Sequence, residues 1–486
     1  MSVSVSARNI GPIGTAEFTL RRLNVFIGPN NTGKSVFATV IHAAFQPLLG
    51  QYYPPVSQLR RLVETKGQEA LPFDETKSND FLVRVLQAGA DLRLDTIPKD
   101  LEQFLSRQVQ DNLQNWGESQ LTAELERCFG APLSEIRRGR TTGAISIRSE
   151  NPQWQLSIEI TGSGARSEIV TPPDLSHLLA LLVSSRTPRE AARRRSLPLE
   201  AARRRHLQLS EHFLPYEVAE NLFTLCFHEF PRRSRYLPAA RSGLLQGHKA
   251  LAGFLISRSS LAGIRDLQIP ALSGVVAEFL SNLVTVDQRQ LGEYRTAAKQ
   301  LEADVLKGEV QLAPTPGGSP EIHFVQQKKD FPLHRTSSMV SEVAPVVIYL
   351  RHLLRRDDLL IIEEPEAHLH PKSQVIFAQV LVQLTNRGAR VLLTTHSEFF
   401  LQQLNNAILA DRVDHEGISS AGMLPNARVS SKNVGAYLFI DRKTGGNVAA
   451  PLEVTSDGGI SEAGFVSVAE SLYDQTIQLG RLAEKN

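Results

Sequence analysis

The sequence has few cysteines, few methionines and no long apolar run. Its 486 residues include two cysteines, Cys128 and Cys226, which stand far apart. Two cysteines cannot cross-link a chain of this size, and neither belongs to a Cys-x-x-Cys pair or to a metal-ligand spacing. A disulfide scaffold and a cysteine-based metal site are therefore excluded, and we expect both side chains to be small buried hydrophobes.

The sequence also lacks a strong excess of charge and any segment suited to a membrane. The formal net charge is +2, so a basic surface must be local. No window approaches the roughly 18 uninterrupted apolar residues of a membrane span. Residues 1–8 alternate like an edge strand and lack the apolar stretch of a signal peptide. We expect a cytoplasmic protein of about two or three domains with no membrane contact.

What the sequence does contain is a phosphate-binding loop between a strand-like and a helix-like segment. The pattern G-x-x-x-x-G-K-[ST] is formed by Gly28, Pro29, Asn30, Asn31, Thr32, Gly33, Lys34 and Ser35, and Val36 opens the helix. Backbone N–H groups of such a loop cradle the phosphates of a nucleotide. Lys34 would contact the β- and γ-phosphates, and the Ser35 hydroxyl would coordinate Mg²⁺. The loop therefore predicts a site for ATP and Mg²⁺; the alternative is a glycine-rich turn of similar sequence.

A second segment has the features of a strand that ends in carboxylates. Residues 359–362 are four apolar residues in a row, which is typical of a strand buried on both faces of a sheet. Carboxylates at the C-terminal end of such a strand lie at the edge where ligands bind in α/β folds. We predict that Glu363 binds Mg²⁺ and that Glu364 orients or deprotonates the attacking water. The alternative is a solvated acidic strand end.

A third strand-like segment ends in a histidine. We expect a helix over residues 371–386 and then a strand over residues 390–395 that leads to His396. A histidine at a strand tip beside the γ-phosphate can hydrogen-bond to it. We therefore predict that His396 acts in catalysis with Glu364 and Lys34; the alternative is a histidine that only packs or caps locally.

Together these segments resemble the ABC-type ATPase heads of RecF, the SMC proteins and the overcoming-lysogenization-defect (OLD) ATPases. Residues 7–13 are similar to their opening strand, and residues 364–371 to the OLD-like form of the acidic motif. Residues 394–397 are similar to their switch-histidine segment, and residues 236–241 to a strand-end segment of prokaryotic members. The resemblance implies a P-loop NTPase head of the α/β class with a mixed β-sheet, and ATP hydrolysis with Mg²⁺.

The resemblance covers only part of the chain, and it also implies partner proteins. It covers roughly residues 1–50 and 230–486, and this chain has Glu363 where the wider family usually has Asp. Such heads form a homodimer or a higher homo-oligomer around ATP. Stand-alone prokaryotic AAA-family ATPases of anti-phage defence systems act with a separately encoded effector, such as a nuclease or a toxin. The segment after His396 is too short for the nuclease domain that OLD proteins append.

The signature of ABC-type heads, which one subunit supplies to the γ-phosphate of its partner, has no full counterpart. The family's Leu-Ser-Gly-Gly-Gln form is absent, and the best match is residues 333–342. There Ser337 and Ser338 precede an expected helix over residues 343–354. The resemblance implies that these serines contact the nucleotide of the partner; the alternative is a plain helix N-cap.

The middle of the chain matches no family that we can name. Residues 144–148 and 155–160 alternate as strands, which predicts a β-hairpin. A short duplication over residues 190–207 contains two arginine triplets, Arg193, Arg194, Arg195, Arg203, Arg204 and Arg205. These arginines could neutralise phosphates of DNA or RNA or bind an acidic partner; the alternative is a solvated loop. A helical pattern then extends over residues 269–307.

We divide the chain into four parts on this basis. Residues 1–55 are an N-terminal ATPase lobe with the phosphate-binding loop, and residues 56–230 are a mainly helical insertion or arm with the β-hairpin. Residues 231–410 are a C-terminal ATPase lobe that carries the signature-like segment, the acidic strand and the switch histidine. Residues 411–486 form a closing hairpin and a C-terminal helix.

The leading hypothesis is an ATP-hydrolysing, ABC-type head that assembles around ATP and controls a separate effector, as in anti-phage defence. One alternative is a DNA-binding ATPase of the RecF kind that acts in DNA repair. Another alternative is not enzymatic: ATP would be a structural ligand of a scaffold that sequesters a partner. Steady-state release of phosphate separates this last hypothesis from the other two.

Overall fold

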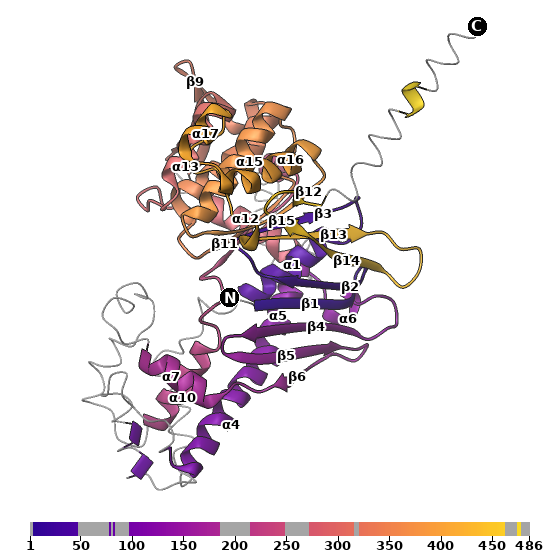
Figure 1. Ribbon diagram of the computed structural model, residues 1–486, viewed down its shortest axis with the longest axis vertical. Coiled ribbons are helices and arrows are strands. Elements are labelled where there is room, and N and C mark those ends of the chain that lie inside the picture. The colour runs from indigo at the N-terminus through magenta and orange to yellow at the C-terminus, as the bar shows by residue number, and fades with distance from the viewer. Residues whose placement is uncertain are drawn as a thin grey trace, which may run out of the picture.

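A large β-sheet lies in the middle of the molecule (Figure 1). The computed structural model describes residues 3–46, 77–78, 81–82, 97–184, 214–247, 272–314, 320–461 and 474–477. In the view of Figure 1, one group of helices covers the upper part of the sheet and a second group lies at the lower left. No helix in these described ranges is long and apolar enough to cross a bilayer.

The main sheet has eleven strands in the order β6-β5-β4-β1-β2-β14-β13-β3-β12-β11-β7. Its strands are β1 (Val3–Ile10), β2 (Ile13–Thr19), β3 (Leu23–Ile27), β4 (Gly143–Glu150), β5 (Gln153–Ile160), β6 (Ala165–Thr171), β7 (Ser234–Leu237), β11 (Leu359–Glu363), β12 (Arg390–Thr395), β13 (Val434–Ile440) and β14 (Asn447–Leu452). The strands from β13 to β7 are parallel, and those from β6 to β2 are antiparallel. The predicted α/β class with a mixed sheet is therefore confirmed.

The helices and the short strands follow between these elements. The α-helices are α1 (Lys34–Phe45), α4 (Lys99–Asn115), α5 (Thr122–Phe129), α6 (Leu133–Ile136), α7 (Leu175–Ser184), α10 (Leu214–Leu225), α12 (Gly274–Val284), α13 (Arg295–Leu301), α14 (Ser338–Ile348), α15 (Pro371–Asn386), α16 (Glu398–Leu409) and α17 (His415–Ser420). The π- and 3₁₀-helices are η2 (Trp116–Leu121), η4 (Glu302–Leu306), η5 (Leu333–Arg335), η6 (Tyr349–Leu353), η7 (Ala410–Arg412) and η8 (Ser431–Asn433). Two small sheets contain β8 (Glu309–Ala313), β9 (Glu321–Gln326) and β10 (Lys329–Pro332), and β15 (Val454–Thr455) with β16 (Gly459–Ile460).

The parallel strands are buried on both faces, as their continuous apolar sequences predict. In β11, Leu359 and Ile361 belong to the core that contains α1, whereas Leu360 and Ile362 belong to the core that contains α13 to α16. Successive side chains of a strand point to opposite faces, so each strand supplies both cores. These helices therefore cover the two sides of the same sheet and hold its ligand-binding edge in place.

The predicted hairpin in the middle of the chain is present and extends the main sheet. β4 pairs with β5, and β4 also pairs with β1 on its other side. A third strand, β6, was not predicted, because its residues 165–171 are largely polar and show no clear alternation. The described part of residues 56–230 thus shares a sheet with the N-terminal lobe. The predicted boundary at residue 55 falls outside the described residues, so the domain division stays a prediction.

The helical pattern predicted over residues 269–307 is present but interrupted. The described part of this range forms α12, α13 and η4, with an irregular connection over residues 285–294. Within it, the N–H of Gly292 donates a 2.6 Å hydrogen bond to the carbonyl of Arg351. A Cβ atom at Gly292 would lie 3.0 Å from that same oxygen, so the backbone approaches η6 closely there. This long-range contact lies in the connection between the two helices, and periodicity does not reveal it.

The C-terminal hairpin and the buried cysteines agree with the predictions from the sequence. The closing hairpin is formed by β13 and β14, which are antiparallel. The predicted C-terminal helix is described only at residues 474–477, which are helical, and the rest lies outside the described residues. Both cysteines are free and buried, as expected.

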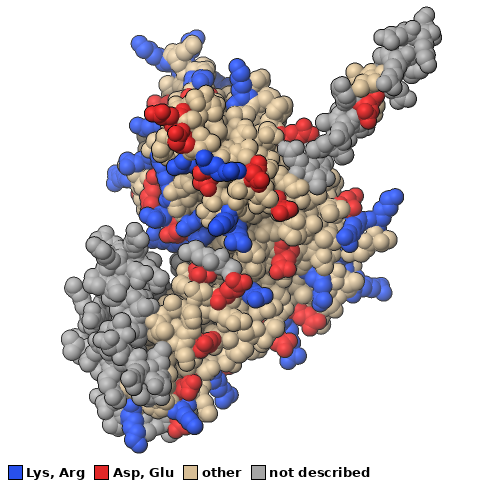
Figure 2. All heavy atoms as spheres, viewed as in Figure 1, with Lys and Arg blue, Asp and Glu red and all other residues tan. Residues whose placement is uncertain are grey.

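On the face shown in Figure 2, basic and acidic side chains are interspersed, in keeping with the small net charge.

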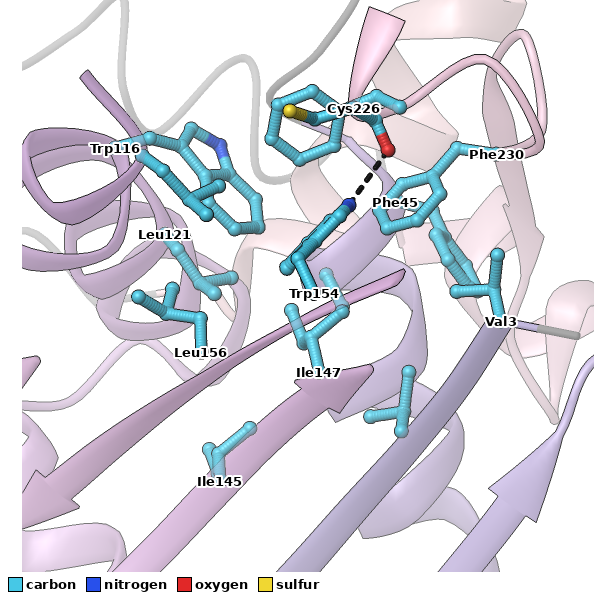
Figure 3. Packing of buried hydrophobic residues seen from close by; sticks show 14 of the residues in the cluster. Val3, Phe45, Trp116, Leu121, Ile145, Ile147, Trp154, Leu156, Cys226 and Phe230 are labelled. Carbon is cyan, nitrogen blue, oxygen red and sulfur yellow. Dashed lines mark hydrogen bonds between the residues drawn. The ribbon is translucent and has the colours of Figure 1, made fainter. Parts of the chain in front are cut away.

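Aromatic side chains pack other parts of the insertion against strand β5 of the main sheet. Trp154 of β5 is fully buried, and its indole N–H donates a 2.8 Å hydrogen bond to the carbonyl of Cys226 (Figure 3). Its ring lies edge-on to Trp116, with centroids 6.4 Å apart, and 5.3 Å from the ring of Phe227. Trp154 therefore buries a large apolar surface while its indole N–H keeps a hydrogen-bond partner. Both features stabilise the folded state.

We predict that Trp154→Ala lowers the free energy of unfolding by about 3–5 kcal/mol, because it leaves a cavity in this core. Trp154→Phe should cost about 1–3 kcal/mol, because it keeps much of the packing but leaves the Cys226 carbonyl without its donor. Thermal and denaturant unfolding would measure both. The control is Val170→Ala on the adjacent strand β6, where the side chain is 54% exposed and the expected effect is below about 0.5 kcal/mol. Equal losses for Trp154→Ala and Val170→Ala would contradict the prediction.

Candidate functional site

The phosphate-binding loop connects β3 to α1 and has the backbone that its glycines permit. Gly28 has φ 138° and Gly33 has φ 103°, both in the region that favours glycine. A Cβ atom at Gly28 would lie 2.4 Å from the carbonyl oxygen of Phe439, and one at Gly33 would lie 2.7 Å from Ile13. Neighbouring strands therefore press on the loop at both positions, and only glycine fits.

Lys34 lies at the first position of α1 and folds back over the loop. It is 6% exposed, and its Nζ donates hydrogen bonds to the carbonyls of Gly28 (2.9 Å) and Pro29 (2.7 Å). Thr32 closes the loop, because its hydroxyl donates to the same Pro29 carbonyl at 2.8 Å. The side chain of Ser35, the residue after Lys34, is exposed. The start of α1, with its unpaired N–H groups and positive end of the helix dipole, suits an anion here.

The other residues of the loop show how much of it faces outward. Pro29, Asn30 and Asn31 are exposed, whereas Thr32 is buried and Val36 is half-buried. The backbone of Asn31 is in the left-handed region, with φ 63°. Its carbonyl accepts a 3.3 Å hydrogen bond from the side chain of Asn447 at the start of β14. The loop is therefore held from behind by the closing hairpin and is open in front.

The sheet brings the acidic strand and the histidine beside this loop. In the parallel register, Ile27 of β3 lies opposite Thr395 of β12, and Thr394 lies opposite Glu363 of β11. Parallel strands end at the same edge, so the segments that follow them converge. Lys34, Glu364 and His396 thus belong to one region, although the sequence separates Lys34 widely from the other two.

The ionisation of Lys34 reflects these neighbours. Burial lowers the pKa of its ammonium group to about 8, and the negative charges of Glu364, Glu366 and Glu363 act against that shift. The carboxylates are therefore near enough to the ammonium group to influence its charge. At neutral pH the group is mostly protonated, as contact with a phosphate requires.

Glu363 and Ser35 line the same pocket, of about 440 Å³. Oε2 of Glu363 accepts a 3.0 Å hydrogen bond from the backbone N–H of Ala239, whereas its buried Oε1 has no hydrogen-bond partner among the described residues. A buried carboxylate oxygen without a partner and a nearby hydroxyl are hard oxygen donors of the kind that Mg²⁺ prefers. These two residues therefore fit Mg²⁺.

Mg²⁺ would need further ligands at this place. Within the described ranges, no group of three or more His, Cys, Asp or Glu side chains could hold a metal ion. Mg²⁺ usually takes one or two protein oxygens and completes its shell with phosphates and water. The set of Ser35 and Glu363 is of that kind, so a nucleotide would bring the missing oxygens.

Glu364 and His396 form a pair. Nε2 of His396 lies 3.5 Å from Oε1 of Glu364, and the two side chains are 30% and 40% exposed, respectively. The His396 contact lowers the pKa of Glu364, and Lys34 and Arg241 add to this effect. Glu364 is therefore ionised at neutral pH and can accept a hydrogen bond from water. Its backbone has φ 42°, which is unusual for a residue other than glycine.

Glu366, to which the sequence assigned no role, positions the histidine segment. Its Oε1 accepts hydrogen bonds from the backbone N–H of His396 (2.7 Å) and from the hydroxyl of Thr395 (2.8 Å). The carboxylate thus ties the turn after β11 to the end of β12. The third glutamate of the Glu-Glu-Pro-Glu run was the signal in the sequence, but its partners lie thirty positions away.

Arg241 is a second residue whose role was missed. It is fully buried on the segment after β7, and its guanidinium donates to the backbone carbonyls of Glu363 (2.7 Å) and Glu364 (3.3 Å). Its Nε lies 3.0 Å from the carboxylate of Glu342 in α14, and both side chains are 1% exposed. Arg241 therefore links α14 to the carboxylate end of β11. Residues 236–241 resemble a family segment, so the sequence indicated this position. It did not reveal the residues that Arg241 contacts.

The serines of the signature-like segment lie at the start of α14. The helix begins at Ser338, earlier than the predicted residue 343, because Ser337 is its N-cap and its hydroxyl accepts a 3.4 Å hydrogen bond from the N–H of Val340. Ser337 and Ser338 are exposed. The capping alternative is therefore present for Ser337, and a contact with a partner stays a prediction. The arginine triplets Arg193–Arg195 and Arg203–Arg205 lie outside the described residues.

One family model matches part of the chain. Residues 265–401 match the family described as an AAA ATPase domain. This range contains Glu363, Glu364 and His396 but begins after the phosphate-binding loop. No curated protein matches the chain.

Three solved structures that match are SMC head domains. The SMC head bound to the C-winged helix domain of ScpA has 9% identity and a TM-score of 0.40, over 93% of this chain and 97% of the other. The head domain from Thermotoga maritima has 9% identity and a TM-score of 0.34, over 93% and 100%. The head with an extended coiled coil bound to the C-terminal domain of ScpA, derived from Pyrococcus furiosus, has 10% identity and a TM-score of 0.36, over 97% and 98%. TM-scores below 0.5 do not establish a shared fold. Residues 265–401 are thus similar to the AAA ATPase domain family, and their strand β12 pairs with β3, which leads into the phosphate-binding loop.

Proposed function

We propose that this chain binds ATP with Mg²⁺ and hydrolyses it as an ABC-type head. The observation that carries the proposal is the convergence of the buried Lys34 ammonium group with the carboxylates of Glu363, Glu364 and Glu366. A phosphate-binding loop beside an acidic strand end is what transfer of a phosphoryl group to water requires. The match of residues 265–401 to an AAA ATPase domain supports it.

Each side chain has a separate task in this proposal. Lys34 binds the β- and γ-phosphates, and Glu364 holds the attacking water in line with the γ-phosphate. His396, beside Glu364, donates a hydrogen bond to the γ-phosphate. Because the pKa of Glu364 is lowered, this carboxylate orients water better than it removes a proton from it. Ser35 and Glu363 would hold Mg²⁺, which when bound neutralises negative charge on the phosphates.

We further propose that two or more copies assemble around ATP. Among the described residues, no hydrogen bond or ion pair joins Ser337 or Ser338 to the phosphate-binding loop or to the carboxylates after β11. The two serines are exposed at the positive end of α14, which suits contact with an anion on another copy. Arg241 connects α14 with the nucleotide site of its own copy. Contact of α14 with the nucleotide of another copy would therefore alter the position of the carboxylates at the end of β11 in the first copy.

The proposed biological role is control of a separately encoded effector, such as a nuclease or toxin of an anti-phage system. This part is supported by the resemblance to stand-alone prokaryotic ATPases alone, which is an argument by analogy. Purification of the tagged chain from its native cell, followed by identification of bound proteins in the presence of ATP and ADP, would test it. A nuclease or toxin retained with one nucleotide only is the expected result, and recovery of the chain without any such protein would contradict the role.

A catalytically weak, ATP-bound scaffold is the second candidate. The lowered pKa of Glu364 and the presence of Glu363 in place of the family's Asp both favour slow turnover. Steady-state release of phosphate separates the two candidates. Turnover below about one per hour, with ATP retained through purification, would favour the scaffold over the ATPase, because typical enzymes reach 1–10³ per second.

We predict that Lys34→Ala weakens ATP binding by about tenfold to a hundredfold, because hydrogen bonds to charged groups contribute about 1.5–3 kcal/mol each. Isothermal titration with a non-hydrolysable ATP analogue would measure the loss. The matched control is Lys99→Ala, at an exposed lysine that begins α4, and it should bind like the parent. Parental affinity and turnover in Lys34→Ala would count decisively against the assignment.

We predict that Glu364→Gln binds ATP normally but hydrolyses it about 10²–10⁴-fold more slowly, the usual contribution of such a group. A closed assembly should accumulate, because ATP is then not consumed. Phosphate release and size-exclusion chromatography with ATP would check both effects. Glu398→Gln, at an exposed carboxylate of α16, serves as the control. If Glu364→Gln turned over at the parental rate, another group would have to activate the water.

ATP affinity should also depend on pH in one direction. Burial lowers the pKa of Lys34 to about 8 in the free protein, so the ammonium group loses its proton as the pH rises through that value. Because phosphates prefer the charged form, the dissociation constant should be flat between pH 6.5 and 7.5 and rise by up to about tenfold per unit above pH 8. Binding measured from pH 6.5 to 9.5 would show this, whereas Lys34→Ala should give a flat profile. Constant affinity of the parent up to pH 9.5 would exclude titration of Lys34.

A further inference from the structure

One face of α1 continues the row of polar side chains that begins with Ser35. Ser35, Thr39 and His42 follow one another at spacings of four and three residues, so they lie on the same side of the helix. The hydroxyl of Thr39 donates a 2.9 Å hydrogen bond to the carbonyl of Ser35, and Thr39 is buried. Of these three side chains, the proposed site for Mg²⁺ and ATP uses only Ser35.

Tyr236 of β7 lies against this face of α1. Its ring is edge-on to the imidazole of His42, with the two centroids 5.2 Å apart. Nδ1 of His42 lies 2.8 Å from the hydroxyl of Ser234, which also belongs to β7, and Nε2 lies 3.2 Å from a carboxylate oxygen of Glu278. Both ring nitrogens of His42 therefore have partners, and the imidazole holds the Tyr236 ring in a fixed place.

The register of the sheet directs Tyr236 to the same side as Glu363. Tyr236 lies opposite Ile361, and both belong to the core that contains α1. The next pair, Leu237 and Ile362, belongs to the core on the other face. Glu363 follows Ile361 by two residues, so its side chain points to the face on which Tyr236 lies.

The hydroxyl of Tyr236 is close to both Thr39 and Glu363. These three side chains line the pocket that also contains Ser35. Burial raises the pKa of Tyr236 well above its ordinary value, the negative charge of Glu363 raises it further, and a hydrogen bond with Thr39 acts in the opposite direction. Tyr236 is therefore a neutral phenol at neutral pH, and its hydroxyl can only donate to a carboxylate.

The carboxylate of Glu363 is held firmly at one oxygen only. Arg241 donates to the backbone carbonyl of Glu363 at 2.7 Å, and the N–H of Ala239 donates to Oε2 at 3.0 Å. The buried Oε1 has no partner at hydrogen-bond distance among the described residues. One anchor does not fix the plane of a carboxylate, and holding a glutamate side chain costs up to about 2 kcal/mol of rotamer freedom. A second donor would keep this side chain ready for a cation.

We propose that Tyr236 is a positioning residue of the metal site. Its hydroxyl and the N–H of Ala239 together hold the carboxylate of Glu363 so that Oε1 faces a divalent cation beside Ser35. The inference rests on the proposed function, because the cation is the one that accompanies the nucleotide. Removal of a partner that orients a metal ligand typically weakens metal affinity by about 10–100-fold.

The test is the affinity for Mn²⁺ in the presence of a non-hydrolysable ATP analogue. Mn²⁺ prefers the same oxygen ligands as Mg²⁺, and electron paramagnetic resonance detects it directly. Tyr236→Phe keeps the ring and removes the hydroxyl, so it should raise the dissociation constant for Mn²⁺ by about 10–100-fold. Its affinity for the analogue without metal should stay parental, because Lys34 and the phosphate-binding loop are unchanged.

The matched control is Tyr349→Phe. Tyr349 is also fully buried, and its hydroxyl accepts a 3.2 Å hydrogen bond from Asn282, but it belongs to the core on the other face of the sheet. This variant loses a comparable hydrogen bond and should keep parental affinity for Mn²⁺. Thermal unfolding of both variants would show how much each hydroxyl contributes to stability alone.

Two further variants separate positioning from packing. In the Glu363→Gln background, Tyr236→Phe should weaken Mn²⁺ binding no further, because the hydroxyl acts only through the carboxylate. Thr39→Val leaves Glu363 as the acceptor for the Tyr236 hydroxyl and should keep or tighten Mn²⁺ binding.

Three results would overturn the proposal. They are parental Mn²⁺ affinity in Tyr236→Phe, additive losses in the double variant, and a loss in Thr39→Val as large as that in Tyr236→Phe. Each of these contradicts the role of Tyr236 while the metal site itself remains. If instead the parent bound the analogue but showed no Mn²⁺ site, the metal assignment of the proposed function would fail, and the inference with it.

Discussion

The candidate site depends on one buried ammonium group that must remain charged. Burial alone lowers the pKa of Lys34, and a neutral amine there could not bind phosphates. The carboxylates of Glu364, Glu366 and Glu363 counteract the desolvation, and two carbonyls of the loop accept hydrogen bonds from the ammonium group. The phosphate-binding loop and the acidic strand end therefore need each other: each supplies the charge that the other requires, and neither half would be a site by itself.

Two residues without an evident catalytic task hold this arrangement together. Glu366 accepts a hydrogen bond from the backbone N–H of His396 and so holds that segment in place. Arg241 donates to the backbone carbonyls of Glu363 and Glu364. Glu364 has a positive φ, a conformation whose cost of about 1–3 kcal/mol must be offset by its surroundings. The hydrogen bond from Arg241 to its carbonyl is one such support. Because Arg241 also pairs with Glu342, the same brace joins the carboxylate end to the helix that begins with the exposed serines.

Local features of the sequence predicted the local parts of the structure. The helix over residues 371–386, the hairpins and the strands of residues 359–363 and 390–395 agree with the structure, because each depends on its own periodicity, caps and turns. Elements with long-range causes were predicted less well. The connection before α13 contains a long-range contact between Gly292 and Arg351, and β6 pairs with β5 although its sequence shows no clear alternation.

The same division holds for the site. The sequence by itself determined which chemical groups are present: a glycine-rich loop with Lys34 and Ser35, three carboxylates after a buried strand, and a histidine after another. Only the tertiary structure decided that they face one another, because the register of β3, β12 and β11 joins segments far apart in the chain. It also decided the partners of Arg241 and Glu366 and placed Tyr236 in the same pocket as Glu363. Hydrogen bonds between distant strands specify such neighbours, and no pattern of nearby residues encodes them.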